Sequence, residues 1–452
     1  MACNEMIRKF LNKLYGNAVV FANLRGQSRV PYLPEEKLGE LRDARLKEIV
    51  KYAAETVPYY RSLFKESKID PREIKTVENL DCLPLLDKDT IRNNPHLFVS
   101  TSRKGRSSIP FVTSGTTGMP LEIYHDKYSL LANIAFGERE REVVSRTCER
   151  KFGYREVAIG YPGNTGSKVW DFYQQMTFIP VRPERLVLSV VEPFERIVEA
   201  VNNFRPDVIA SYGSYLETLF KILDLQGIEM HLPRILIYGA DSMTSEGRSF
   251  IEKKFGIPIM SIYNAVEVFK LGFFCEERKG FHLHEDLCHV KIIDASGQRV
   301  ANGEKGEVVI SNLINRGTIL LNYRLGDIAS ISSQKCSCGR TLPLLMELEG
   351  RVEDIIFLPN GEFVHPRAVW RVFKGRNEIL QYQLIQHEQE RFELRLVTVD
   401  SKIHQNVING ILSDLRHLLG ESAIIESGYY EELERQGSGK FRPVISLCGV
   451  SV

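Results

Sequence analysis

Four short apolar runs alternate with helical stretches in the middle of the chain, and this alternation limits the fold more than any other feature. The runs are Val157–Ile159, Val208–Ala210, Ile235–Ile237 and Ile259–Ile262, and the helical stretches cover Pro193–Asn203, Ser214–Gln226 and Ser245–Phe255. An order of strand, helix, strand, helix is typical of a parallel or mixed sheet with helices on both faces. The sequence therefore predicts an α/β fold.

The pattern changes towards the C-terminus. Between about residues 290 and 335, short strands separated by turns such as Asn302–Gly306 indicate an antiparallel β subdomain. Beyond Arg351 the apolar positions suit a small α+β domain. We therefore predict a large N-terminal domain over residues 1–350, in which mixed sheets are layered with helices and which includes the β subdomain, and a small α+β domain over residues 352–452.

Composition excludes several classes of function. The 452 residues carry 59 basic and 58 acidic side chains, a net charge of +1, so there is no excess of positive charge for nucleic acid. No apolar run approaches the ~20 residues that a membrane span needs. Residues 1–12 lack the apolar segment of a secretory signal. We expect a cytoplasmic protein that binds neither nucleic acid nor membrane, and a homodimer stays open.

A loop of hydroxyl side chains and glycines says most about the chemistry. Its members are Thr113, Ser114, Gly115, Thr116, Thr117 and Gly118. Glycines permit positive φ, which lets backbone N–H groups converge on phosphate oxygens, and the hydroxyls add further donors. The loop has no lysine and is not the Walker A sequence, which argues against a P-loop nucleotidase. An ordinary surface turn is the alternative for any loop of this composition.

The order Thr-Ser-Gly-Thr-Thr-Gly-x-Pro resembles the phosphate loop of the adenylate-forming acyl/aryl-CoA ligase superfamily. Further segments resemble motifs of that superfamily in the same order along the chain: Gly239–Asp241, Tyr263–Glu267, Tyr323–Asp327, Gly350–Asp354 and Gly437–Arg442. Two positions depart from the pattern, because Asp241 replaces a glutamate and Asn264 replaces a glycine. Six matches in order are far more specific than any one of them.

The resemblance implies a nucleotide site for ATP. The loop from Thr113 to Gly118 would hold the phosphates, and Asp327 would accept hydrogen bonds from both ribose hydroxyls. The remaining residues that the resemblance assigns to the nucleotide are Gly239, Ala240, Asp241, Tyr263, Asn264 and Arg351.

The same resemblance implies the catalytic groups. Glu267 would hold Mg²⁺, and Lys440 would bridge the incoming carboxylate and the α-phosphate. Near Asp354 the C-terminal domain would rotate between the two half-reactions. Glu267 and Lys440 together argue against a non-catalytic nucleotide-binding homologue, which is the alternative of another class.

Three segments near the N-terminus, Ile49–Ala53, Val57–Arg61 and Leu83–Lys88, resemble the phenylacetate–CoA ligase-like branch, which includes capsule-biosynthesis-associated homologues. This resemblance implies an AMP-forming ligase that activates a small carboxylic acid, aryl or related, and transfers it to coenzyme A. Transfer to a carrier-protein thiol or to an amine is the alternative. The segments Tyr161–Gly163 and Tyr212–Tyr215 are candidates for the acid pocket.

Four soft ligands form two half-sites, Cys275 with His282 and Cys336 with Cys338. Three thiolates and one imidazole suit a tetrahedral Zn²⁺ without an open position. Free buried thiols, or His284 or His289 in place of His282, are the alternatives. Some phenylacetate–CoA ligase relatives carry similar residues on a structural zinc, and the resemblance implies the same here.

Overall fold

The computed structural model describes residues 2–102, 107–113, 120–178, 184–346, 348, 350–376, 378–436 and 438–448. Helices dominate the first hundred residues. Two of them begin at Pro58 and Pro95, because proline needs no N–H partner in the first turn of a helix. The helices are α1 (Ala2–Leu24), α2 (Glu35–Thr56), α3 (Pro58–Glu66), α4 (Lys88–Asn93) and α5 (Pro95–Phe98), with 3₁₀ turns at Gln27–Tyr32, Pro71–Glu73 and Val77–Cys82.

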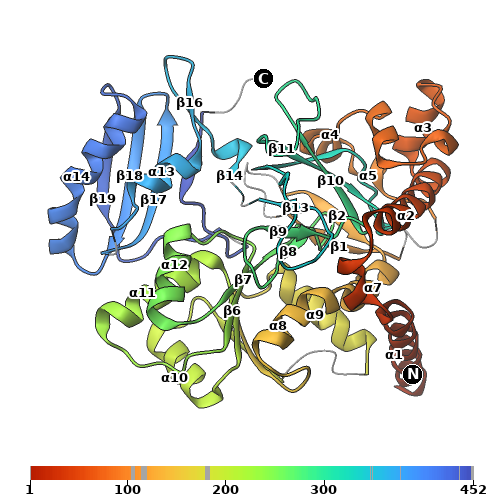
Figure 1. The fold of residues 1–452 in the computed structure, drawn as a ribbon, viewed down its shortest axis with the longest axis horizontal. Helices are drawn as coiled ribbons and strands as arrows, with labels where there is room; N and C mark the ends of the chain where they lie inside the picture. The colour runs from red at the N-terminus through yellow and green to blue at the C-terminus, as the bar shows by residue number, and fades with distance from the viewer. Residues whose placement is uncertain are drawn as a thin grey trace.

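An eight-stranded sheet forms the centre of the large domain (Figure 1), in the order β13-β9-β8-β7-β6-β5-β3-β4. Five of its strands are parallel, namely β3 (Arg155–Gly160), β4 (Glu184–Ser189), β5 (Val208–Ser211), β6 (Ile235–Gly239) and β7 (Ile259–Tyr263). The antiparallel strands are β8 (Gly272–Phe274), β9 (Phe281–Leu283) and β13 (Leu344–Leu345). The predicted mixed α/β sheet is therefore confirmed.

Helices cover both faces of this sheet (Figure 1). They are α8 (Glu138–Thr147), α9 (Thr165–Met176), α10 (Phe194–Phe204), α11 (Gly213–Gln226) and α12 (Ser245–Phe255). The helix α7 (Lys127–Phe136) begins where the Asp126 carboxylate accepts hydrogen bonds from the backbone N–H groups of Tyr128 and Ser129. Buried side chains of α10 to α12 and of the parallel strands form one continuous apolar cluster.

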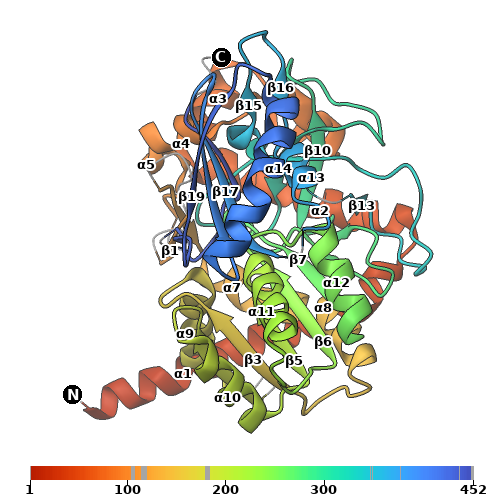
Figure 2. The ribbon, with the colours of Figure 1, turned by 90° about the vertical axis from the view of Figure 1, so that its left-hand side faces the viewer.

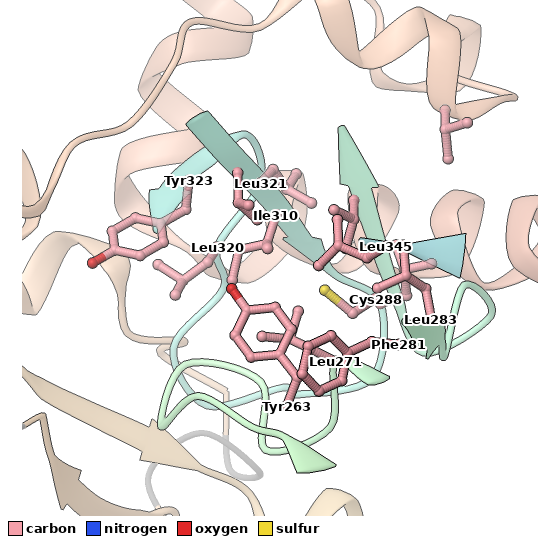
Figure 3. Packing of buried hydrophobic residues seen from close by; sticks show 14 of the residues in the cluster. Tyr263, Leu271, Phe281, Leu283, Cys288, Ile310, Leu320, Leu321, Tyr323 and Leu345 are labelled. Carbon is pink, nitrogen blue, oxygen red and sulfur yellow. The ribbon is translucent and has the colours of Figure 1, made fainter. Parts of the chain in front are cut away.

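The β subdomain is an antiparallel sheet in the order β10-β11-β12-β14. Its strands are β10 (Cys288–Ile293), β11 (Gly306–Asn312), β12 (Tyr323–Ala329) and β14 (Gly350–Arg351), and a separate hairpin pairs β1 (Ile109–Val112) with β2 (Glu122–His125). Figure 3 shows the core that joins this sheet to the large one, where Tyr263, Phe281 and Cys288 lie close to Ile310 and Leu345. The shared core fixes β12 relative to the end of β7.

Residues from Ile356 to Val444 enclose a core of their own. A sheet in the order β19-β18-β17-β20 carries α14 and α13 (Figure 2). The elements are β15 (Ile356–Phe357), β16 (Phe363–Val364), α13 (Pro366–Val372), β17 (Ile379–Glu388), β18 (Arg391–Thr398), α14 (Ser401–Leu419), β19 (Ile424–Tyr429) and β20 (Val444–Ser446), after a 3₁₀ turn at Val352–Asp354. No helix in the described part of the chain is long and apolar enough to span a bilayer.

Candidate active site

A cavity of about 270 Å³ lies where the carboxyl ends of β6 and β7 meet β12, β14 and the small domain. Side chains at the carboxyl ends of parallel strands meet at one edge of a sheet, which is the usual place for ligands in such folds. The cavity brings together nine residues that the sequence predicts for the site: Thr113, Ala240, Asp241, Tyr263, Asn264, Glu267, Asp327, Arg351 and Lys440. Gly239 ends β6 beside them but does not line the cavity. Ser114, Gly115, Thr116, Thr117 and Gly118 lie outside the described residues.

Asp327 is held between a phenol and a guanidinium. The Tyr263 hydroxyl donates to Asp327 Oδ2 at 2.6 Å, and Arg351 Nε lies 3.3 Å from Asp327 Oδ1. The pairing of β12 with β14 places Asp327 directly opposite Arg351. Burial, followed by the Asp327 charge, raises the pKa of Tyr263 well above its usual value, so the phenol remains a donor. The carboxylate keeps acceptor capacity for a ligand hydroxyl.

Glu267 is buried and its backbone is fixed on both sides. Asn312 Nδ2 donates to the Glu267 carbonyl at 3.0 Å, and the ring of His125 contacts the Val266 carbonyl through Nε2 at 2.7 Å. The Tyr323 hydroxyl donates to Glu267 Oε1 at 3.4 Å. These contacts aim the carboxylate into the cavity, where a cation with oxygen ligands could bind it.

Lys440 comes from the small domain and is partly buried in the same cavity. Burial lowers the pKa of its ammonium, and the nearby Arg351 lowers it further. The carboxylates of Asp327, Glu267 and Asp241 act in the opposite direction. The ammonium therefore lies in a desolvated position where a bound anion would be its natural partner.

Two tyrosines of the large domain contact residues 438–440, the Lys440 loop. The Tyr212 hydroxyl donates to the Ser438 carbonyl at 2.9 Å. Gly439 has φ +82°, and a Cβ there would lie 2.3 Å from the Tyr212 hydroxyl oxygen and 2.5 Å from Tyr161 Cβ, so only glycine fits. Tyr161 and Tyr212, the sequence candidates for the acid pocket, thus contact this loop and do not line the cavity, whereas Ser214 does.

Asp241 and Arg435 form a second clamp, which the sequence analysis missed. Asp241 Oδ2 accepts from the Ser214 hydroxyl at 2.5 Å and from the Phe441 backbone N–H at 3.3 Å. Arg435 Nη1 lies 3.5 Å from the same oxygen and donates to the Gly439 carbonyl at 3.1 Å. The guanidinium also lies over the rings of Tyr212 and Phe441. No motif identifies Arg435, whose one signal is its position four residues before Gly439.

Lys88 also lines the cavity. The carboxylate of Asp87 accepts from the Thr90 backbone N–H and begins α4, whose first residue is Lys88. Burial lowers the pKa of Lys88, although Glu353 opposes this shift. A second ammonium, from the large domain, thus reaches the same cavity as Lys440.

The four predicted metal ligands, Cys275, His282, Cys336 and Cys338, come together, with all ligand atoms within 4.8 Å of one another. The Sγ atoms of Cys275 and Cys336 are 3.7 Å apart, too far for a disulfide, and Cys338 Sγ lies 3.3 Å from His282 Nε2. A tetrahedral zinc would set these edges at about 3.8 and 3.6 Å. The residues therefore fit zinc. His284 and His289 instead contact Glu140 and Glu285, so they are not the fourth ligand.

Comparisons with known proteins agree with this fold. The CapK C-terminal domain matches residues 356–447. Phenylacetate–coenzyme A ligase of Thermus thermophilus is 28% identical over 403 residues, which cover 86% of this chain and 87% of that protein, and the enzyme of the same name from Aromatoleum evansii is 23% identical over 434 residues, covering 91% and 94%. The crystal structure of a 2-hydroxyisobutyryl-CoA ligase in its postadenylation state superposes with a TM-score of 0.73 at 16% identity, covering 92% and 91% of the two chains.

The fold is that of the adenylate-forming CoA ligases. The chain is similar to phenylacetate–CoA ligases over most of its length, and residues 356–447 match the C-terminal domain named after CapK. Both parts of the resemblance predicted from the sequence, the superfamily and the branch, are confirmed.

Proposed function

We propose that this chain is an ATP-dependent, AMP-forming acid–thiol ligase. It activates a small carboxylic acid as the acyl-adenylate and transfers the acyl group to coenzyme A. The observation that carries the proposal is that Lys440 of the small domain shares one cavity with Glu267 and Asp327 of the large domain. A lysine that shares a cavity with two carboxylates, one to hold a cation and one to accept ribose hydroxyls, suits the attack of a carboxylate on an α-phosphate.

Each residue has a defined task in the first half-reaction. Asp327, held by Tyr263 and Arg351, accepts the ribose hydroxyls, and the end of β6 at Gly239–Asp241 borders the adenine together with Asn264. Lys440 binds the incoming carboxylate and the α-phosphate at once. The loop of residues 113–118 binds the outer phosphates. Glu267 would hold Mg²⁺, which would supply charge stabilisation at the phosphate oxygens.

The second half-reaction needs Lys440 to leave. A thiol must reach the carbonyl carbon that Lys440 covers, so the small domain rotates near Asp354 after pyrophosphate has left. The division into residues 1–350 and 352–452 follows from this proposal. Coenzyme A is the favoured acceptor because the curated relatives are CoA ligases, and a carrier-protein thiol or an amine are the other candidates.

Zinc would be held by Cys275, His282, Cys336 and Cys338 in a structural role. Four protein ligands leave no open position for catalysis. Arg340, whose backbone N–H points at Cys338 Sγ at 3.5 Å and whose guanidinium pairs with Glu276, would support the thiolates. A cytoplasmic location and a homodimer stay predictions.

A screen of carboxylic acids tests the proposal. Pyrophosphate release is measured for each acid with ATP and Mg²⁺, with and without coenzyme A. Release that needs one acid, and a thioester product that needs coenzyme A, are expected. Adenylation without thioester formation would assign the chain to carrier-protein or amine transfer. Nucleotide binding without pyrophosphate from any acid would indicate the non-catalytic alternative.

A further inference from the structure

Helix α1 turns its apolar side away from the protein. Its second half packs on α7 and α9, with Gly16, Val19 and Val20 buried. Gly16 is required there because a Cβ would lie 1.8 Å from the Met176 carbonyl oxygen. The large apolar side chains exposed on this helix are 47–68% accessible: Met6, Ile7, Phe10, Leu11, Leu14, Tyr15 and Phe21.

These exposed residues form one continuous stripe. At about 3.6 residues per turn, Ile7, Leu14 and Phe21 lie along one line of the helix, with Phe10 and Leu11 on either side of it. Gly16 and Val19 lie on the opposite side, where the helix contacts the body. Monomeric proteins seldom leave such a stripe in water without a use for it. Figure 2 shows that the N-terminal part of α1 extends beyond the body, so a flat surface can approach it.

The charges beside the stripe are positive. Arg8 and Lys13 lie at its two borders, Lys9 lies on the opposite side of the helix in line with Gly16, and Glu5 is the single acidic residue of the helix. Lys13 Nζ lies 5.4 Å above the ring of Phe178, which packs on Phe10 at 5.4 Å and is itself half-exposed. Basic residues at the borders of an apolar helical face are the arrangement that binds anionic lipid headgroups while the apolar face enters the acyl region.

We propose that α1 is an in-plane anchor that docks this protein on the surface of an anionic phospholipid bilayer. This contact differs from a membrane span, and it departs from the sequence expectation of a protein without a membrane partner. A second copy of the chain suits the surface less well. In a pair of α1 helices there would be six basic side chains, Arg8, Lys9 and Lys13 from each copy. Within the pair, only the two Glu5 carboxylates could neutralise them. The inference does not depend on the proposed ligase activity.

Vesicle sedimentation of the full chain tests the proposal. The protein is mixed with sucrose-loaded vesicles of phosphatidylcholine alone or with about 30% phosphatidylglycerol, at low and high salt. We expect binding to the anionic vesicles that salt weakens, and little binding to the neutral ones. Ile7→Glu/Leu14→Glu should weaken binding by about tenfold or more because two apolar side chains no longer enter the lipid. Arg8→Ala/Lys13→Ala should remove most of the preference for anionic lipid.

Matched controls separate lipid binding from folding. Ile424→Glu alters an equally exposed isoleucine on the small domain and should leave vesicle binding unchanged. Melting temperature should stay the same in all variants, because Ile7, Leu14 and Ile424 are about half-exposed and Lys13 loses only its contact with the half-exposed ring of Phe178. Absence of binding to anionic vesicles, or equal binding by Ile7→Glu/Leu14→Glu, would overturn the proposal. A dimer in solution that this double variant dissociates, without vesicle binding by the native chain, would show instead that the stripe pairs two copies.

Discussion

The carboxylate of Asp241, at the carboxyl end of β6, lies 3.5 Å from the guanidinium of Arg435 in the small domain. Both side chains are almost fully buried, and burial raises the pKa of Asp241 although Arg435 opposes the shift. The same guanidinium donates to Gly439, the residue before Lys440. The pair therefore links the position of the small domain to the position of Lys440.

Arg435→Ala should reduce acid-dependent ATP–pyrophosphate exchange by about tenfold or more, because the arrangement that places Lys440 in the cavity loses a buried ion pair. Thioester formation from a supplied acyl-adenylate should change little, since that step needs Lys440 to leave. Arg391→Ala, which removes a surface arginine of the same domain, is the control. Equal losses in both half-reactions would show that Arg435 only stabilises the fold.

Lys440→Ala tests the proposed role of Lys440 in adenylation. Removing the ammonium should lower pyrophosphate exchange by a factor on the order of 10² or more, because the charge that would stabilise the α-phosphate in the transition state is lost. Lys88→Ala is the informative comparison, since Lys88 reaches the same cavity from the large domain and does not move with Lys440. Exchange at the native rate in Lys440→Ala would refute the assignment.

Cys336→Ser should remove zinc and lower the melting temperature together. The thiolate is one of four ligands, and a lost ligand weakens a site that can contribute on the order of 10 kcal/mol to a local fold. A fall of about 5 °C or more is expected. Cys82→Ser, at an exposed cysteine away from the cluster, should change neither quantity. Only trace zinc in native protein purified without chelator would contradict the site.

Site residues at the strand ends and in the loops can be predicted from the sequence, because each lies in a short motif. Asp327 and Tyr263 were named for that reason, and the structure brings their side chains within 2.6 Å. Asn264, which replaces a glycine, needs no unusual backbone: the positive φ angles near it are 70° at Ala240 and 60° at Phe269. Local patterns could be predicted because neighbouring residues alone determine them.

Contacts between distant segments could not be predicted in this way. Arg435 meets Asp241 across 194 positions of the chain, and no periodicity connects them. The exposed stripe of α1 could not be predicted in this way, because a pattern of apolar residues on a helix does not show whether they face the core or the solvent. Both tyrosines proposed for the acid pocket, Tyr161 and Tyr212, have enough aromatic character for a pocket but pack on the Lys440 loop. The aromatic residue type suggests that these side chains pack on something, but the three-dimensional fold decides that their partner is the Lys440 loop.

Acid should weaken the fold through Glu140. Its carboxylate accepts from Lys270 at 2.7 Å and lies 3.1 Å from His284 Nε2. Burial alone would raise the pKa of Glu140, but Lys270 and His284 outweigh it and lower the pKa to about 2. The unfolded chain therefore takes up this proton first, so the stabilisation is complete above about pH 4.5 and is lost as the pH falls towards about 2.

Glu140→Gln should accordingly lose a few kcal/mol of unfolding free energy near pH 7 and show a flatter pH dependence between about pH 4.5 and 2. Urea denaturation at several pH values measures both effects. Glu142→Gln alters a neighbouring glutamate on α8 whose partner Arg146 is exposed, and it should change stability by less than about 1 kcal/mol. Parallel pH curves for the native chain and Glu140→Gln would contradict the explanation.

Asp354→Pro tests whether the small domain rotates near this residue. Asp354 ends the 3₁₀ turn that follows β14 and pairs with Arg442, two residues after Lys440. Proline fixes φ near about −65° and removes a donor, so it should trap one arrangement of the domains. We expect adenylation to persist, because the structure already has Lys440 in the cavity, and thioester formation to fall by about tenfold or more.

The substitution also breaks the ion pair with Arg442, so a second variant is needed. Asp354→Ala removes the same carboxylate but leaves the backbone free to rotate. If rotation matters, Asp354→Ala keeps both half-reactions close to native while Asp354→Pro loses only the second. Loss of thioester formation in both variants would assign the effect to the carboxylate and its contact with Arg442. Native rates in Asp354→Pro would mean that the chain bends elsewhere, and the turn at Val352–Asp354 would then move as a rigid part of one domain.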